Sequence, residues 1–244
     1  MVLILRLLKK CITELLFYIL PPKCPSCTTN VTDMHAFCAP CWSDLNFITK
    51  PFCNICGKTL PFTVKQETNC LQCYHNPPIY QHARAILNFD EKSKKLIHYF
   101  KYYDKTSLAK IFANTLYTLY SDEINKCDII ISVPMHKLKR MLRFYNHAFV
   151  LAQEIAKISN KPLHGDILIK TKWTKSQAKL SKKQRDRNLY GSFEIKNQAL
   201  IANKKVILVD DVLTTGSTIS ICTKELKKYA HSVLVLCVAF THLR

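Results

Sequence analysis

The feature that most constrains the fold of this chain is an apolar run that ends in two carboxylates. Residues 206–209 are four consecutive apolar residues, three of them β-branched, and Asp210 and Asp211 follow directly. Such a run favours a central strand that is buried on both faces of a parallel sheet. Because an unpaired carboxylate is rarely buried, we expect the strand to end at the acid pair.

A loop of small hydroxyl residues around one glycine follows the acid pair. Residues 214–218 read Thr-Thr-Gly-Ser-Thr, in a chain that has only four glycines among 244 residues. The amphipathic stretch from Ile219 to Tyr229 predicts a helix whose positive N-terminal end points at this loop. In open α/β sheets, ligands bind outside the carboxyl ends of the strands. The pattern therefore predicts an anion site, since capping of an ordinary helix accounts for one hydroxyl only.

The sequence VILVDDVLTTGST, residues 206–218, resembles the signature of type I phosphoribosyltransferases. These proteins bind 5-phosphoribosyl-1-pyrophosphate with Mg²⁺. The resemblance implies that Asp210 and Asp211 hold the ribose hydroxyls and that the following loop wraps the 5′-phosphate. The motif is not the dinucleotide-binding pattern, and it lacks the Gly-Lys of a P-loop. The implied phosphate ligands are Thr214, Thr215, Gly216, Ser217 and Thr218.

Eight of the twelve cysteines form four Cys-x-x-Cys pairs. Each pair directs two thiolates at one tetrahedral ion, and two pairs complete a closed Cys₄ zinc site, which is structural rather than catalytic. The simplest arrangement is two zinc ribbons in tandem, although interleaved pairing also satisfies the spacing. The segment 23–80 has few residues for a core, so zinc is expected to stabilise it. The predicted ligands are Cys24, Cys27, Cys38 and Cys41 in the first ribbon, and Cys53, Cys56, Cys70 and Cys73 in the second.

A disulfide framework is the alternative to zinc, and the absence of an export signal argues against it. Residues 1–22 have their polar side chains at helical spacing and lack the small residues of a cleavage site. They predict an amphipathic helix that packs on the protein or, alternatively, on a membrane surface. We therefore expect a cytoplasmic protein. The remaining cysteines lie in apolar surroundings and are expected to be buried: Cys11, Cys127, Cys222 and Cys237.

Strand and helix patterns alternate after residue 80. Apolar runs at 83–89 and 128–133 predict strands, and amphipathic stretches at 94–102, 108–120 and 146–157 predict helices. This alternation predicts an α/β fold with a parallel sheet flanked by helices, as in type I phosphoribosyltransferases. Residues 171–192 fit neither period and predict a mobile loop or a hairpin. The expected domains are an amphipathic helix (1–22), a double zinc ribbon (23–80) and a phosphoribosyltransferase-like domain (81–244).

The order of the motifs along the chain resembles the ComF/GntX family of competence-associated, phosphoribosyltransferase-like proteins. Members have a double zinc ribbon, then V-P-L-H and R-G-F-N-Q segments, then Q-x-x-L-x-x-x-x-R-x-x-N and finally V-D-D-V-x-T-T-G. This chain has VPMH at 133–136, RFYNH at 143–147, QAKLSKKQRDRN at 177–188 and VDDVLTTG at 209–216. Phe144 and His147 replace the usual glycine and glutamine, and a bulky residue in place of glycine changes how closely the backbone approaches the pyrophosphate.

The chain is strongly basic, with a formal net charge of +19. Between His136 and Tyr190, fourteen Lys or Arg residues face only three acidic ones, an excess of eleven positive charges. Such a segment attracts phosphorylated ligands and nucleic acid. The candidates for the pyrophosphate and for a closing loop are His136, Arg143, Arg185 and Arg187. The candidates for single-stranded DNA are Lys182, Lys183 and Arg185, with Trp173 for stacking.

The family resemblance implies a role in natural transformation, in which the protein handles incoming single-stranded DNA in the cytoplasm with other competence or DNA-processing proteins. Two alternatives stay open. One is an active phosphoribosyltransferase that acts on an unknown nucleobase or nucleotide acceptor, for which the sequence identifies no catalytic residue and no residue that recognises a base. The other is a zinc-stabilised scaffold for other competence proteins.

Overall fold

The computed structural model describes residues 18, 20–33, 35–61, 68–102, 107–136, 145–172, 184 and 188–241. The chain forms two compact units, Met1–Leu45 and Asn46–Arg244. The boundary between them falls within the segment 23–80, so the two predicted zinc ribbons belong to different units. Most of the predicted N-terminal helix, residues 1–17 and 19, lies outside the described residues.

The first unit is built around the first two cysteine pairs. A tight turn after Cys24 brings the Thr28 N–H to 2.9 Å from the Cys24 carbonyl oxygen. In the second pair, Cys38 is the N-cap residue of the short helix α2 (Ala39–Ser43), Cys41 lies within it, and its first turn contains a proline. Proline suits this position because its missing N–H would have no partner within the helix. Both pairs therefore lie on short, locally hydrogen-bonded turns.

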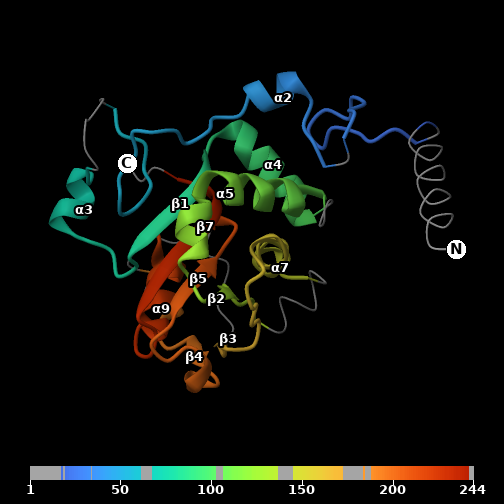
Figure 1. The fold of residues 1–244 in the computed structure, drawn as a ribbon. Helices are drawn as coiled ribbons and strands as arrows, with labels where there is room; N and C mark the ends of the chain where they lie inside the picture. Colours follow the sequence, from blue (N-terminus) through green and yellow to red (C-terminus); the bar gives the residue numbers. More distant parts are fainter. Residues whose placement is uncertain are drawn as a thin grey trace, which may run out of the picture. The chain divides into compact units, whose positions relative to one another are not determined.

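A parallel sheet forms the centre of the second unit (Figure 1). Its strands are β1 (His82–Asn88), β2 (Ile129–Ser132), β5 (Lys205–Val209) and β7 (Ser232–Phe240), in the order β1-β7-β5-β2. The two-residue strand β6 (Val212–Leu213) pairs with the end of β7. All of these pairs are parallel. The carboxyl ends of the strands therefore lie at one edge, where the acid pair follows β5.

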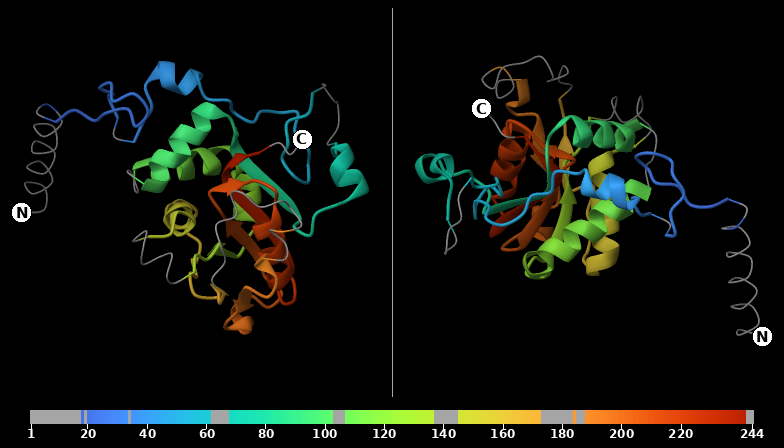
Figure 2. Two further views of the ribbon diagram at one scale, coloured as in Figure 1. Left: turned by 180° about the vertical axis from the view of Figure 1, so that it is seen from behind. Right: turned by 90° about the horizontal axis from the view of Figure 1, so that it is seen from above.

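Helices cover both faces of the sheet (Figure 2). Helices α4 (Glu91–Tyr102), α5 (Ser107–Asn125) and α7 (His147–Ser159) lie on one face, and α9 (Ser217–Leu226) lies on the other. The α9 face is closed by alternate strand residues, among them Val206, Leu208 and Cys237, packed against Ile219 and Cys222. Among the described residues, no helix has the length and apolar character needed to cross a membrane.

The predicted fold class is confirmed: the second unit is an α/β structure with a parallel sheet between helices. Each strand and helix predicted after residue 80 is present, with ends that differ by a few residues. Strand β3 (Leu168–Lys170) pairs antiparallel with β4 (Phe193–Ile195) and frames the segment 171–192, most of which lies outside the described residues. A 3₁₀ turn, η2 (Gln198–Leu200), then leads into β5. Cys127, Cys222 and Cys237 are buried, as predicted, and Cys11 lies outside the described residues.

Candidate functional site

The paired cysteines gather into two groups of four. In each group the sulfur atoms lie within 4.8 Å of one another, and the groups follow the tandem arrangement. Zn–S bonds of about 2.3 Å in a tetrahedron place two sulfurs about 3.8 Å apart. The Cys27 and Cys38 sulfurs are 3.5 Å apart, and those of Cys56 and Cys70 are 3.8 Å apart. The residues present therefore fit one structural zinc ion in each group.

The second cysteine group docks on the edge strand β1 through the backbone of its first knuckle, the turn from Cys53 to Gly57. The Ala83 N–H donates to the Ile55 carbonyl oxygen at 2.7 Å. Gly57 has φ +72°, and a Cβ atom on it would lie 2.5 Å from the Ala83 carbonyl oxygen. Only glycine therefore permits this approach. The ribbon also covers backbone groups that an edge strand would otherwise expose.

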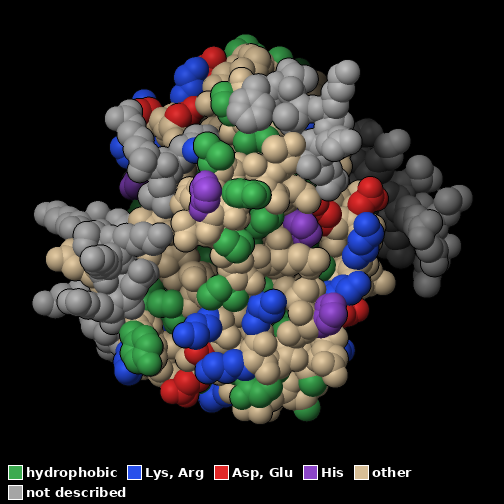
Figure 3. All heavy atoms as spheres, turned by 90° about the vertical axis from the view of Figure 1, so that its left-hand side faces the viewer, with side chains coloured by type: hydrophobic (Ala, Val, Ile, Leu, Met, Phe, Trp, Pro, Cys, Tyr) green, Lys and Arg blue, Asp and Glu red, His purple; other side chains and the backbone are tan. Residues whose placement is uncertain are grey.

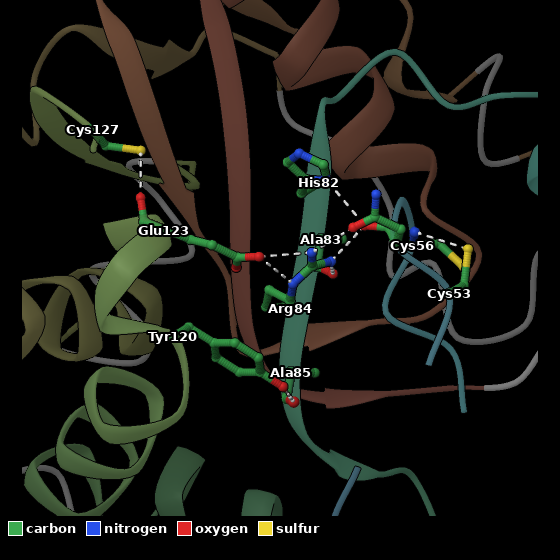
Figure 4. Close-up of polar contacts among 10 residues, drawn as sticks. Cys53, Cys56, His82, Ala83, Arg84, Ala85, Tyr120, Glu123 and Cys127 are labelled. Atoms are coloured by element: carbon green, nitrogen blue, oxygen red, sulfur yellow. Dashed lines mark hydrogen bonds and ion pairs between the residues drawn. The ribbon is translucent and has the colours of Figure 1, made fainter. Parts of the chain in front are cut away.

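A buried arginine, Arg84, hydrogen-bonds to the backbone of the same knuckle (Figure 4). Arg84 is 3% exposed, and its guanidinium donates to Glu123 Oε1 at 2.7 and 3.0 Å and to the Asn54 carbonyl oxygen at 2.8 Å. The guanidinium also lies 5.3 Å from the centroid of the Phe52 ring. Residues from the knuckle, from β1 and from α5 thus meet at one charged group. Helix α3 (Leu71–His75) contains the last cysteine of the cluster, Cys73, and completes this part.

The predicted acid pair lies at the carboxyl end of β5, next to a lysine that the sequence did not single out. Lys101, near the end of α4, places its Nζ 2.8 Å from Asp211 Oδ2. The Asp211 N–H donates to Asp210 Oδ1 at 2.9 Å. Burial, followed by the negative charge of Asp211, raises the pKa of Asp210 to about 7, while the Asp211 N–H and Lys101 oppose the rise. Asp210 therefore changes its charge near neutral pH.

The loop after the acid pair leads directly into α9. Gly216 is the N-cap residue with φ +75°, and within the described part of the chain no side chain caps this end of the helix. The backbone N–H groups of the first turn thus remain available for an anion. A Cβ atom on Gly216 would contact only Leu213, at 3.9 Å, so the glycine is required by its backbone conformation and not by crowding. The Thr215 and Ser217 hydroxyls lie 3.2 Å apart in the same loop.

The segment around the VPMH motif is tied to the acid pair through the end of α4. Asn146 caps α7 by accepting from the Ala148 N–H at 3.2 Å, and its amide donates to the Val133 carbonyl oxygen at 2.9 Å. His147 is 2% exposed, stacks on Tyr145 and lies 3.0 Å from the Lys101 carbonyl oxygen. The departure from the family glutamine therefore places a buried ring against the backbone of the lysine that pairs with Asp211.

Several predicted site residues lie outside the described residues. Of the pyrophosphate candidates, His136 is the last residue of the VPMH motif after β2 and is half-buried, whereas the other three lie outside the described residues. The DNA candidates lie outside them too, as does Phe144. The residues concerned are Arg143, Trp173, Lys182, Lys183, Arg185 and Arg187.

A cavity of about 300 Å³ lies beside the loop, between the loop and the second cysteine group. Leu213, the stretch 214–217, Ser220 and Ile221 form one side of it. Residues of the second ribbon and the linker to β1 form the other side, and the end of β7 contributes Phe240 and Thr241. Phe240 also packs against both the ribbon core and the core of the sheet. The ribbon is therefore one wall of a cavity at the carboxyl ends of the strands.

Charge is mixed on the face shown in Figure 3. Figure 3 shows a face on which Lys and Arg side chains are interspersed with acidic, histidine and hydrophobic ones. Several basic side chains lie in the lower half of this face, and acidic side chains lie beside them. This face thus differs from a continuous basic patch.

Comparison with known proteins identifies both parts of the chain. Residues 15–74 match the model of the double zinc ribbon domain, and residues 146–244 match that of the phosphoribosyl transferase domain. The fold and the site thus define a phosphoribosyltransferase-type protein with an N-terminal double zinc ribbon. Its two four-cysteine clusters suit structural zinc.

The chain is similar to Competence protein F of Haemophilus influenzae, with 29% identity over 215 residues, 84% of this chain and 91% of the relative. It is also similar to the DNA utilization protein YhgH of Escherichia coli K12, with 27% identity over 79% of this chain and 85% of the relative. The predicted resemblance to the ComF/GntX family is thereby confirmed. A purine phosphoribosyltransferase structure from Pyrococcus horikoshii matches 54% of this chain and 76% of its own, with 18% identity and a TM-score of 0.35.

Proposed function

We propose that the protein binds phosphoribosyl pyrophosphate with Mg²⁺ at residues 210–218 and acts in the handling of single-stranded DNA during natural transformation. The assignment of this ligand rests on the acid pair at the end of β5 and on the uncapped N-terminus of α9, which follows after β6 and the loop. Carboxylates accept hydrogen bonds from ribose hydroxyls, and a helix N-terminus with free N–H groups binds phosphate. Bound Mg²⁺ would neutralise charge on the pyrophosphate.

The names of the relatives support the DNA part of the proposal. One relative is called a competence protein and the other a DNA utilization protein, and the chain covers most of the length of each. The net charge of +19 suits a polyanionic partner. We assign the contacts to Lys182, Lys183 and Arg185 on phosphates and to Trp173 on a base. Single strands that have entered the cytoplasm, passed on with other competence or DNA-processing proteins, are the proposed substrate.

Calorimetry with phosphoribosyl pyrophosphate and Mg²⁺ tests the ligand site. The wild type is expected to release or take up heat on binding, and the double variant D210N/D211N is expected to lose affinity while keeping its fold. The variant D166N, which removes an exposed acid elsewhere, is the matched control and should bind normally. Absence of binding by the wild type at millimolar ligand would overturn this part of the proposal.

Gel-shift titration of a single strand over a series of salt concentrations tests the DNA site. The logarithm of affinity should fall linearly with the logarithm of salt, by about 0.7 for each phosphate contacted. The variant K182A/K183A/R185A should flatten this slope. The variant W173A should weaken binding and leave the slope unchanged. The variant K204A/K224A/K227A removes the same charge from exposed positions and is the control. A slope that the first triple variant leaves unchanged contradicts the assignment.

Phosphoribosyl transfer is the second candidate function, and the cavity beside the loop favours it. In this reaction an acceptor atom forms a bond to the anomeric carbon while the bond from that carbon to pyrophosphate breaks. The chain's own residues would anchor the 5′-phosphate and orient the ribose. The test is to add an acceptor and measure the release of pyrophosphate. The wild type should release it, and D210N/D211N should not. Zinc-loaded protein that binds ligand but releases no pyrophosphate with any nucleobase would be a binding module.

A further inference from the structure

The cavity between the second cysteine group and the loop 214–217 is not accounted for by phosphate and ribose recognition. It is lined by residues of the second ribbon, by the loop and by the end of β7, whereas neither carboxylate of the acid pair lines it. A volume of about 300 Å³ is at the lower end of the range of small-molecule sites, about 300–1,000 Å³. It suits one small ligand or one group of a larger ligand.

The lining of the cavity combines flat apolar surfaces with a few polar groups. The rings of Tyr80 and Phe240 and the side chains of Pro78, Leu213 and Ile221 supply the apolar part. Aromatic side chains stack on planar rings, and apolar side chains pack against them. The cavity is therefore suited to a flat ligand more than to a sugar.

The polar groups of the ribbon wall match the edge of a nucleobase. Gln72 and Asn76 line the cavity from the end that holds Cys73, and each amide offers both a donor and an acceptor. Side-chain amides pair with the donor and acceptor groups of base edges in this way. Thr241 also lines the cavity, but its hydroxyl oxygen is buried.

Among the described residues that line the cavity, apart from the cysteines of the cluster, Lys58 is the one with a charged side chain. Lys58 lies on the ribbon wall, and within the described ranges its side chain makes no hydrogen bond or ion pair. Its charge disfavours a cationic ligand and favours one that carries or adjoins a phosphate. Residues 214–217 also line the cavity.

We propose that this cavity binds an unpaired nucleobase and that the second zinc ribbon supplies its recognition groups, Gln72 and Asn76, with Lys58 near an attached phosphate. The inference rests on the proposed phosphoribosyl pyrophosphate site and adds the partner that would lie beside it. The base can come from a free base or nucleotide, as an acceptor, or from a single strand of DNA. Cys56 and Cys73 line the same cavity, so zinc in the second cluster would hold the ribbon wall in place.

Fluorescence of 2-aminopurine in the zinc-loaded, full-length protein tests this assignment, because stacking quenches it. One arm uses the free nucleoside 2-aminopurine riboside, and the other uses an oligothymidylate with one 2-aminopurine at its end. We expect quenching in at least one arm, and that arm identifies the source of the base. The variant Q72A/N76A should weaken this binding by about tenfold or more, since two hydrogen bonds are lost. It should retain two zinc ions and normal affinity for phosphoribosyl pyrophosphate.

The control is N114A, which removes an exposed amide from α5 and should quench as the wild type does. Quenching in neither arm, or equal binding by Q72A/N76A and the wild type, overturns the nucleobase site even if phosphoribosyl pyrophosphate binds. If the wild type fails to bind phosphoribosyl pyrophosphate, the proposed function fails, while quenching that depends on Gln72 and Asn76 still supports the cavity as a base site. The two proposals therefore fail separately.

Discussion

The Lys101 ammonium lies 2.8 Å from Asp211 Oδ2, so the end of α4 neutralises part of the acid pair. Both side chains are partly exposed, at 27% and 20%, which leaves the pair accessible to a ligand. The Lys101 carbonyl oxygen accepts from the Tyr145 hydroxyl at 3.0 Å and lies beside His147. The position of the lysine therefore depends on the segment that follows the VPMH motif.

Replacing this lysine should change the pH at which the acid pair loses its charge. Lys101 lowers the pKa of Asp210, so K101M is expected to raise it above its value of about 7. The pH below which phosphoribosyl pyrophosphate binding is lost should then move higher, because a nearby positive charge favours the ionised carboxylate. Calorimetry from pH 6 to 9 measures the shift, and K95M, on the exposed side of the same helix, is the control.

Asp210 should also make stability depend on pH. Its pKa is raised from 3.8 to about 7 on folding, so the folded state binds more protons than the unfolded state between these values. The contribution to stability is fully present below pH 3.8 and is lost as pH rises through about 7. Thermal unfolding between pH 5.5 and 8 should therefore show a loss of stability in the wild type that D210N lacks. Parallel pH profiles of the two proteins would contradict the raised pKa.

Arg84→Met should loosen the second ribbon from the sheet. The change removes the hydrogen bonds to Asn54 and leaves Glu123, which is 31% exposed, without its ion pair. Breaking a buried charge pair costs about 3–5 kcal/mol, and partial exposure of Glu123 reduces this to about 2 kcal/mol. Denaturant unfolding measures the loss. The variant R84M/E123L should recover part of it, because the uncompensated carboxylate is then gone as well.

The two cysteine clusters should respond differently to substitution. Elemental analysis is expected to find two zinc ions in the wild type and one in either C24S/C27S or C53S/C56S. The second pair of substitutions should also lower the unfolding temperature of unit Asn46–Arg244, because this cluster packs against β1 and Phe240. Equal effects of the two variants on that transition would show that the second ribbon adds nothing to the sheet.

The sequence identified the parts of the site that are contiguous in the chain. The acid pair, the loop and the helix after it follow one another within residues 206–226, so local patterns contain the information. The cysteine pairs are recognisable for the same reason, because metal ligands require a fixed short spacing.

Local patterns could not predict contacts between segments that lie far apart in the sequence. Strand β7 was absent from the predicted strands, although it is the longest and lies between β1 and β5. Lys101 is one of many lysines in the sequence, and only the fold brings it to Asp211, which is 110 positions away. The same holds for Arg84 and Asn54, since a single arginine in a strand has no local signal of a buried partner.

The central position of β7 has a consequence for how the protein is made. Leu234 pairs with His82, which precedes it by 152 residues, and the same strand pairs with β5 on its other side. On the ribosome, β1 (His82–Asn88) and β2 (Ile129–Ser132) are made long before the strand that joins β1 to the others exists. The nascent chain therefore exposes apolar strand edges until late in translation, and its dependence on chaperones should be greatest just before β7 emerges.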